Sequence, residues 1–166
     1  MTHAENTNPT FDTFSNSSNW ATRAGTPPST AADWNMSTQN PCPAGYRVPT
    51  RAEFDGLANT TLNTWTRTGT GGFGTLIDPS ISVNNLTNWT AGAKVGTALY
   101  LPAAGYRSNS DGSTTMRGGT GVYWTSMAYN TTSCIYFAVN VGGQSTTEIG
   151  FGSGRTHGRS VRCIAE

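Results

Sequence analysis

Four short runs of β-branched and aromatic residues limit what this chain can fold into. They are ALYLPAAGYR (98–107), GVYWTS (121–126), CIYFAVNV (134–141) and SVRCI (160–164). Runs of this kind, bounded by Gly, Asn and Asp, predict strands, and SNSDGST (108–114) contains the Asp-Gly pair of a hairpin turn. With 35% hydrophobic and 11% charged residues in 166, the composition disfavours a helical bundle. We therefore expect one α+β domain with a mostly antiparallel sheet and long ordered loops.

One helix has a clear start signal. Thr50-Arg51-Ala52-Glu53 is a capping box, in which the Thr50 hydroxyl accepts from the amide of Glu53 and the Glu53 carboxylate reaches back. Phe54 lies where a hydrophobic staple would place it. The pattern predicts a helix that begins after Thr50 and runs to about Ala58 or Leu62.

The remaining segments define the organisation. Residues 1–40 are rich in Asn, Ser, Thr and Pro and predict an irregular arm, and residues 66–89, interrupted by Gly and Asp-Pro, predict a long ordered loop. Arg47 and Arg162 sit inside apolar strings, so we expect each to be paired or hydrogen-bonded. The expected core residues are Tyr46, Val48, Phe54, Leu57, Leu99, Leu101, Trp124, Phe137, Val139, Val161 and Ile164.

The charge balance argues against several partners. The formal net charge is +1, so no extended basic field is present for nucleic acid. No apolar run approaches the roughly 18 residues needed to cross a bilayer, and the start of the chain lacks the apolar segment of a signal peptide. We expect no nucleic-acid partner and no membrane insertion.

Three cysteines allow at most one intramolecular disulfide. Cys42 and Cys163 lie near the two ends of the structured region, and their pairing would close a long loop. Three reduced, buried thiols are the alternative, which a reducing compartment would favour.

A segment near the C-terminus has its own pattern. In IGFGSGRTHG (149–158), glycines separate most of the residues Ile149, Phe151, Ser153, Arg155 and His157. If the segment is extended, alternation places these five side chains on one face. Because the face mixes apolar and polar groups, we expect an exposed binding face; a flexible glycine-rich loop is the alternative.

Four sequence blocks carry a resemblance to a known family. They are PCPAGYRVPTRAEFDGL (41–57), LPAAGYRSNSDGS (101–113), GVYWTS (121–126) and GRSVRCI (158–164). Together they resemble the Fibrobacter succinogenes major paralogous domain family, which is similar to the C-type lectin-fold variable proteins of diversity-generating retroelements and to formylglycine-generating enzymes. The resemblance implies a C-type lectin-like domain over 41–166, with a scaffold over 41–121 and a variable ligand-binding region over 122–157.

The resemblance also sorts the residues of that region. Adenine-directed mutagenesis of Asn-type codons cannot produce Trp, Met, Lys, Gln or Glu, so Trp124, Met127, Gln144 and Glu148 are expected to belong to the scaffold. The odd Cys134 would be one outcome of a variable codon. The candidate ligand-binding residues are those that such codons permit: Val122, Tyr129, Asn130, Thr131, Thr132, Cys134, Tyr136, Asn140, Ser145, Phe151, Ser153, Arg155 and His157.

The function that the resemblance implies is display of hypervariable side chains toward a cell-surface protein or glycan, at a bacterial cell surface or on a phage virion. Tyr129, Tyr136, Phe151 and Arg155 would be the anchors, because aromatic residues and Arg carry most interface energy. A non-diversified surface adhesin and a structural fibre-tip module of the same fold are the alternatives, and the oligomeric state stays open.

We expect no catalytic site, cofactor or metal. The formylglycine-generating enzymes use a pair of cysteines near the active site, whereas here Cys163 is expected to pair with Cys42, which leaves Cys134 without a second thiol. His157 has no Cys or His at zinc-ligand spacing. The acidic residues are scattered, although backbone carbonyls leave a calcium site open.

Overall fold

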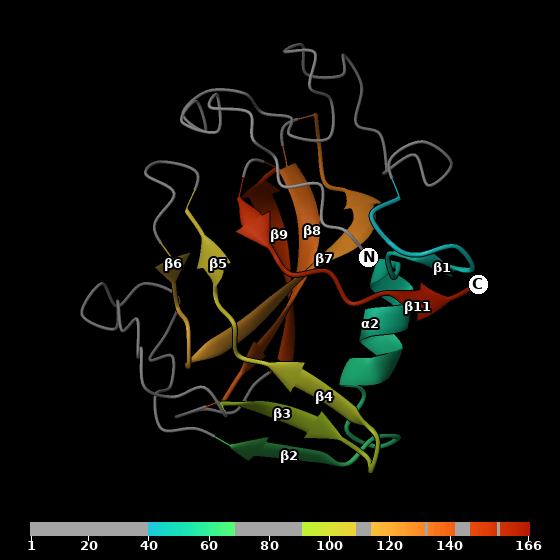
Figure 1. The fold of residues 1–166 in the computed structure, drawn as a ribbon, viewed down its shortest axis with the longest axis vertical. Helices are drawn as coiled ribbons and strands as arrows, with labels where there is room; N and C mark the ends of the chain where they lie inside the picture. The colour runs from blue at the N-terminus through green and yellow to red at the C-terminus, as the bar shows by residue number, and fades with distance from the viewer. Residues whose placement is uncertain (1–39, 69–90, 109–113, 132, 142–146, 156) are drawn as a thin grey trace.

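The computed structural model describes residues 40–68, 91–108, 114–131, 133–141, 147–155 and 157–166, with only the backbone described for residues 68, 147–149 and 151–153. Short, mostly antiparallel strands and one helix make up this part of the chain, which confirms the α+β prediction (Figure 1). The elements are β1 (Tyr46–Arg47), α2 (Arg51–Ala58), β2 (Trp65–Thr68), β3 (Gly92–Val95), β4 (Leu99–Pro102), β5 (Tyr106–Arg107), β6 (Thr114–Thr115), β7 (Thr120–Ala128), β8 (Ser133–Asn140), β9 (Thr147–Gly154), β10 (Gly158–Arg159) and β11 (Ile164–Ala165).

Helix α2 begins as the capping box predicts. The Thr50 side chain accepts a hydrogen bond from the backbone N–H of Glu53 at 3.3 Å, and the Glu53 carboxylate accepts one from the backbone N–H of Thr50 at 2.8 Å. At the other end, the Asn63 amide donates to the carbonyl oxygens of Gly56 and Leu57 at 2.9 and 3.0 Å. Both ends of the helix therefore have partners for backbone groups that lack one within the helix.

Strands β7, β8 and β9 form the central antiparallel sheet. Trp124 lies opposite Tyr136, and Tyr136 lies opposite Gly150. Because residues opposite each other share a face of the sheet and neighbours alternate, Trp124 and Tyr136 lie on one face. Tyr123 and Phe137, which pair with each other, lie on the opposite face.

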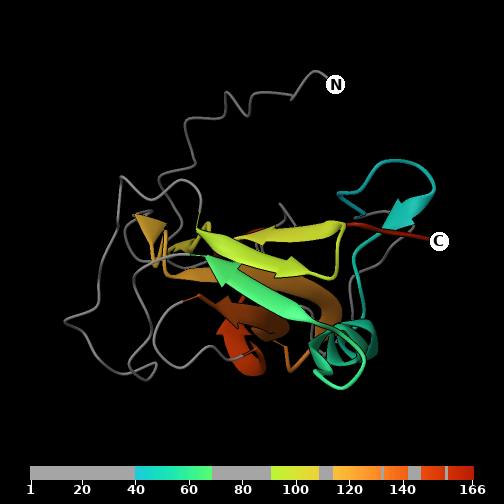
Figure 2. The same ribbon diagram turned by 90° about the horizontal axis from the view of Figure 1, so that it is seen from below.

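The face that carries Phe137 packs against α2 and the β2-β3-β4 sheet (Figure 2). Phe54 of α2 stacks on Phe137 with ring centroids 4.5 Å apart, and Trp65 packs on the same ring at 6.4 Å. Phe137 and Leu101 have no exposed surface. Full burial of one such side chain stabilises the fold by about 1.5 to 3 kcal/mol, so this layer is the main core.

The opposite face of the central sheet is covered by segments from the two ends of the described chain. Val48, Trp124 and Cys134 form a second, smaller apolar cluster, against which Cys42 and Val161 pack. Both faces of the central sheet are therefore covered by other segments of the chain.

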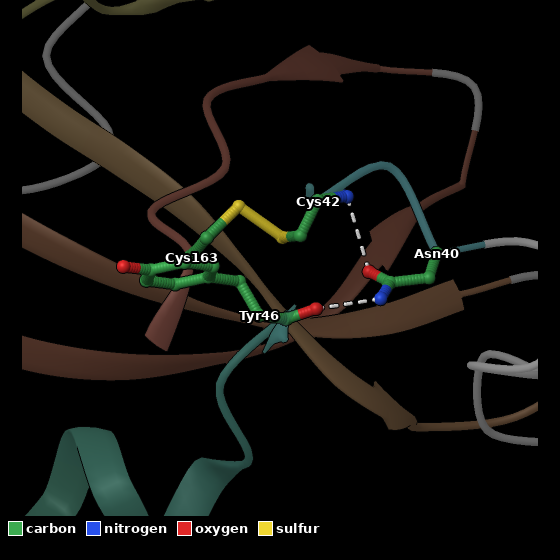
Figure 3. The surroundings of a disulfide bond; sticks show 4 residues. All are labelled: Asn40, Cys42, Tyr46 and Cys163. Carbon is green, nitrogen blue, oxygen red and sulfur yellow. Dashed lines mark hydrogen bonds between the residues drawn. A yellow bond between two sulfur atoms is a disulfide. The ribbon is translucent and has the colours of Figure 1, made fainter. Parts of the chain in front are cut away.

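A disulfide joins the segments that cover this second face. Cys42 and Cys163, 121 residues apart in sequence, are bonded with their Cα atoms 5.9 Å apart (Figure 3). The Asn40 side chain accepts from the Cys42 N–H at 3.1 Å and donates to the Tyr46 carbonyl at 2.7 Å (Figure 3). Next to it, β1 and β11 pair antiparallel, with Tyr46 opposite Ala165. The disulfide expected from the sequence is present.

Two expected core residues are exposed. Tyr46 is 46% exposed and Ile164 is 36% exposed, because they belong to the separate two-stranded β1–β11 sheet and not to the packed layers of the core (Figure 1). Arg47 is paired as predicted, by two hydrogen bonds to Glu53. Arg162 is exposed, so water solvates its charge and the physical reason for expecting a partner does not apply to it.

The strand predictions need two corrections. Strand β2 enters the 66–89 segment that the composition predicts as a loop, while 69–89 lie outside the described residues, as do the arm 1–39 and the Asp-Gly turn at 109–113. The run SVRCI is not a single strand: Ser160 forms a parallel bridge to Tyr123, and β11 begins only at Ile164. The N–H and carbonyl of Ser160 bond to the backbone of β7. The pairing of β10 with β5 therefore ends at Arg159.

Candidate functional site

The candidate site lies where short strands from distant parts of the sequence meet the second face of the central sheet. Strand β10 pairs with β5, which places Arg159 opposite Tyr106. The next residue, Ser160, accepts from the Trp124 N–H at 2.9 Å and donates to the Val122 carbonyl at 3.1 Å. These backbone bonds hold Arg159 beside β7 and β5 at the same time.

Arg159 is enclosed by three aromatic rings, which we call the aromatic box: Tyr106, Trp124 and Tyr136. Its guanidinium carbon lies 3.9 Å from the ring centroid of Tyr136, 4.9 Å from that of Trp124 and 5.0 Å from that of Tyr106. A cation over aromatic faces within about 6 Å is attracted by the negative potential of each ring. The box is therefore a built cation site, and the chain's own Arg159 occupies it.

Burial dominates the electrostatics of the box. Desolvation lowers the pKa of Arg159 to about 10, against the opposing effects of Tyr136, Tyr106 and a hydrogen bond to the Tyr136 side chain. The guanidinium nevertheless carries its charge at neutral pH, so the attraction to the three rings is present under ordinary conditions.

Tyr136 is also held from the neighbouring strand. A Cβ atom built on Gly150 would collide with the Cζ, Cε1 and hydroxyl atoms of the Tyr136 ring. The ring thus lies directly over the Gly150 backbone, while it also stacks with Arg159. Tyr136, predicted as a ligand anchor, has much of its ring area engaged inside the protein.

His157 lies at the edge of the box. Its ring meets Tyr106 edge-on, with centroids 5.2 Å apart and an interplanar angle of 87°. Burial, followed by the nearby positive charge of Arg159, lowers the pKa of His157, and a hydrogen bond to the backbone of Arg107 opposes this. We therefore expect a neutral imidazole near pH 7, half-buried and adjacent to exposed Arg107.

Of the predicted residues whose exposure the structure describes, the exposed ones lie on the β7–β8 turn. Tyr129 is 52% exposed, and the N–H groups of Tyr129 and Asn130 both donate to the Ser133 carbonyl, at 3.0 and 3.2 Å. The Arg155 guanidinium donates to the Asn130 carbonyl at 2.9 Å. This bond ties the turn to the segment that follows β9, so the two regions lie side by side.

The predicted ligand-binding residues divide by burial. Tyr129 and Asn130 are exposed, and Thr131, Tyr136 and His157 are partly exposed. Thr132 and Ser145 lie outside the described residues, and for Phe151 and Ser153 only the backbone is described. Four predicted residues are buried: Val122 at 2%, Cys134 at 1%, Asn140 at 5% and Arg155 at 7% exposure.

The four buried residues were predicted to face a ligand, and their burial shows that this prediction is wrong for them. Cys134 packs with Val48 in the second cluster, and Asn140 accepts a hydrogen bond from the Thr120 hydroxyl at 3.0 Å. They are buried because both faces of the central sheet are covered, so neither side of the alternation in β7 and β8 is open to water over most of their length. Val122, Cys134, Asn140 and Arg155 therefore do not present a ligand-contacting surface here.

The single face expected for residues 149–157 depends on unbroken alternation, which the backbone register of β9 does not keep. Strand β9 pairs Phe137 with Ile149 and Cys134 with Ser153, and the register shifts between Cys134 and Tyr136. Such an irregularity inserts an extra residue and interrupts strict alternation. Arg155 lies in a turn beyond the strand.

Tyr106 and Arg159 were not among the predicted site residues, and Trp124 was predicted to belong to the scaffold alone. No local signal marked Arg159, because the alternation of the glycine-rich segment does not continue past the register shift in β9. Tyr106 carried no such signal, since only the β5–β10 pairing brings it to the site.

In the part of the chain that the structure describes, no three His, Cys, Asp or Glu side chains are grouped to hold a metal ion. Among the same residues, no helix has the length and apolar composition that spanning a bilayer requires. Comparison with protein-family models, with curated proteins and with solved structures found no match.

Proposed function

We propose that this protein is a ligand-binding display protein with a C-type lectin-like fold, whose exposed C-terminal loops present side chains diversified by a retroelement. The observation that carries the proposal is the pair of exposed residues Tyr129 and Asn130 on the β7–β8 turn, tied by Arg155 to the segment that carries His157. Both residues are of types that a variable Asn-type codon permits.

The rigidity of the surrounding structure supports this proposal. The turn projects from a sheet covered on both faces, and the disulfide closes the ends of the domain. Recognition surfaces of Tyr, Asn, Thr and His on a rigid scaffold combine aromatic contact area with adaptable hydrogen bonding. Trp124, expected in the scaffold because its codon class cannot vary, is 1% exposed.

Burial narrows the proposed contact set. Tyr129, Asn130, Thr131 and His157 are the described candidates for ligand contact. Cys134 is better explained as a small core residue than as a random outcome of variation, because it fills the space beside Val48 and Trp124. The proposed ligand is a protein or glycan on a cell surface, bound by a protein displayed on a bacterium or a phage virion.

Sequencing of the 3′ end of the gene in its source population tests the diversification. We expect substitutions at adenines to concentrate in codons 129–131 and 157, with codons 124 and 134 constant. If codons 122–157 are as constant as codons 41–121, the retroelement proposal fails and a non-diversified adhesin becomes the better account.

Alanine variants test the binding face itself. The labelled protein would be applied to a glycan array and to intact bacterial cells. We expect Tyr129→Ala to weaken any binding that is found by about tenfold or more, the usual effect of removing an aromatic anchor. Leu62→Ala is the matched control, because Leu62 is 74% exposed but follows α2, outside the proposed face. Equal binding by both variants would refute the proposed face.

A further inference from the structure

We infer that Arg159 is a positioning residue for the binding surface: its cation fills the aromatic box and thereby fixes the segment that presents His157. The inference rests on the proposed function for its biological meaning. The box itself stands on the geometry around Arg159 alone.

The aromatic box is assembled from three separate elements. Tyr106 comes from β5, Trp124 from β7 and Tyr136 from β8, and each ring centroid lies within 3.9 to 5.0 Å of the Arg159 guanidinium carbon. Cation–ring attraction strengthens when both groups are removed from water. Burial lowers the pKa of Arg159, so this guanidinium is largely removed from water and its attraction to the three rings is of the stronger, desolvated kind.

Arg159 lies in a short segment that runs alongside β7. Gly158 and Arg159 make up β10, which pairs with only two residues of β5. A two-residue ladder is too short to be stable alone. Backbone bonds of Ser160 already join the segment to β7. The side chain of Arg159 adds ring contacts to β7 and β8, so the segment is held by three elements rather than two.

His157 connects the aromatic box to the proposed binding surface. His157 lies two residues before Arg159 and packs edge-on against Tyr106, one wall of the box. A change in the occupant of the box therefore reaches His157 both through the chain and through Tyr106. Tyr136 is a wall of the same box, which makes it a part of the scaffold rather than a ligand anchor.

The aliphatic stem of an arginine also packs, so the role of the charge has to be separated from the role of the stem. Arg159→Lys keeps a cation, whereas Arg159→Met keeps a stem of similar length without charge. We expect the melting temperature to fall in the order wild type, Arg159→Lys, Arg159→Met. A melting temperature for Arg159→Met equal to or above that of Arg159→Lys would overturn the inference.

Chemical rescue tests the box directly, with methylguanidinium as the probe. Arg159→Ala should leave a box that takes up the free cation, and a ligand present at ten times its Kd shifts the folding equilibrium by about elevenfold. We expect 100 mM methylguanidinium to raise the melting temperature of Arg159→Ala by about 3 to 5 °C relative to the same concentration of NaCl. Arg162→Ala, which removes an exposed arginine of the same segment, should show no such increase.

The NMR signals of the His157 ring supply a readout that a general loss of stability would not move. The chain has two histidines, so the ring resonances are few. We expect them to shift in Arg159→Ala and to return toward their wild-type positions with methylguanidinium. Equal responses of wild type, Arg162→Ala and Arg159→Ala to the probe would overturn the inference.

These measurements use no biological ligand, so their failure is distinct from failure of the proposed function. If rescue fails while codons 129–131 vary, the display proposal stands and the box is only packing. If rescue succeeds while codons 122–157 are constant, the inference about Arg159 holds and the diversification proposal fails.

Discussion

Replacing Glu53 by Gln removes one negative charge from the junction of β1 and α2 while nearly preserving the shape of the side chain. The Glu53 carboxylate accepts two hydrogen bonds from the Arg47 guanidinium, at 2.8 and 2.6 Å. It also accepts from the backbone N–H and the hydroxyl of Thr50, at 2.8 and 3.0 Å. A single carboxylate thus joins the N-cap of the helix to the preceding strand.

These contacts hold the pKa of Glu53 at about 2, below its ordinary value of 4.5, with the Arg47 hydrogen bonds as the largest cause. In a fully enclosed site such a shift would correspond to about 3 kcal/mol. The Glu53 side chain is 31% exposed, and solvent screens the pair, so we expect Glu53→Gln to cost about 1 to 2 kcal/mol at pH 7.

The pH dependence follows from the sign of the shift. Because the folded-state pKa is depressed, the stabilisation is complete above the unfolded-state pKa of about 4.5 and is lost as the pH falls toward 2. At pH 3 we expect less than about half of the pH 7 difference between wild type and Glu53→Gln to remain.

Urea unfolding followed by circular dichroism, at pH 7 and pH 3, measures both quantities. Asp55→Asn is the matched control, since Asp55 lies on the same helix and pairs with Arg51 at 3.3 Å with its side chain 50% exposed. That pair should contribute no more than about 0.5 kcal/mol. The reasoning is refuted if Glu53→Gln matches wild type at pH 7, or if its deficit is the same at pH 3.

Two further predictions concern covalent and steric constraints. Reducing the Cys42–Cys163 disulfide, or replacing both cysteines by serines, should lower the free energy of unfolding by up to about 5 kcal/mol, because the bond closes a long loop. Urea unfolding with and without reductant measures the difference, and a reductant effect that persists in the serine variant would contradict this assignment. Gly150→Ala should destabilise the fold by more than about 1 kcal/mol, because the new methyl group collides with the Tyr136 ring. Gly56→Ala is the control: its methyl group enters open space on α2 and should stabilise the fold by about 0.5 to 1 kcal/mol. Equal changes in melting temperature for the two variants would refute the packing at Gly150.

The central strands illustrate how far sequence reasoning reaches. The runs 121–126 and 134–141 lie within or overlap β7 and β8, and Phe137 occupies the core as alternation predicts. Strands β2 and β3 were missed, since Gly92–Val95 has no alternating apolar pattern and gains its place only by pairing with β2 and β4. Short strands of this kind are specified by their neighbours more than by their own residues.

The candidate site shows the same limit more sharply. The exposed turn at Tyr129 and Asn130 was within reach, because polar and aromatic residues between two strands predict a turn at the surface. The burial of Val122 and Asn140 was not, since the rule that sorted them concerns codons and carries no information about which faces are covered. The register shift between Cys134 and Tyr136 likewise depends on three strands together.

The sequence by itself determined the elements whose signals are local: the capping box of α2, the two long strands and their turn, and the position of the cysteines at the ends of the domain. The tertiary structure alone decided that both faces of the central sheet are covered and that Tyr106, Trp124 and Tyr136 enclose Arg159. The physical reason is that hydrogen bonds of a cap join residues three apart. Burial and cation–ring contacts instead join residues far apart in the sequence, such as Phe54 with Phe137 and Tyr106 with Arg159, whose approach is set by the packing of the whole domain.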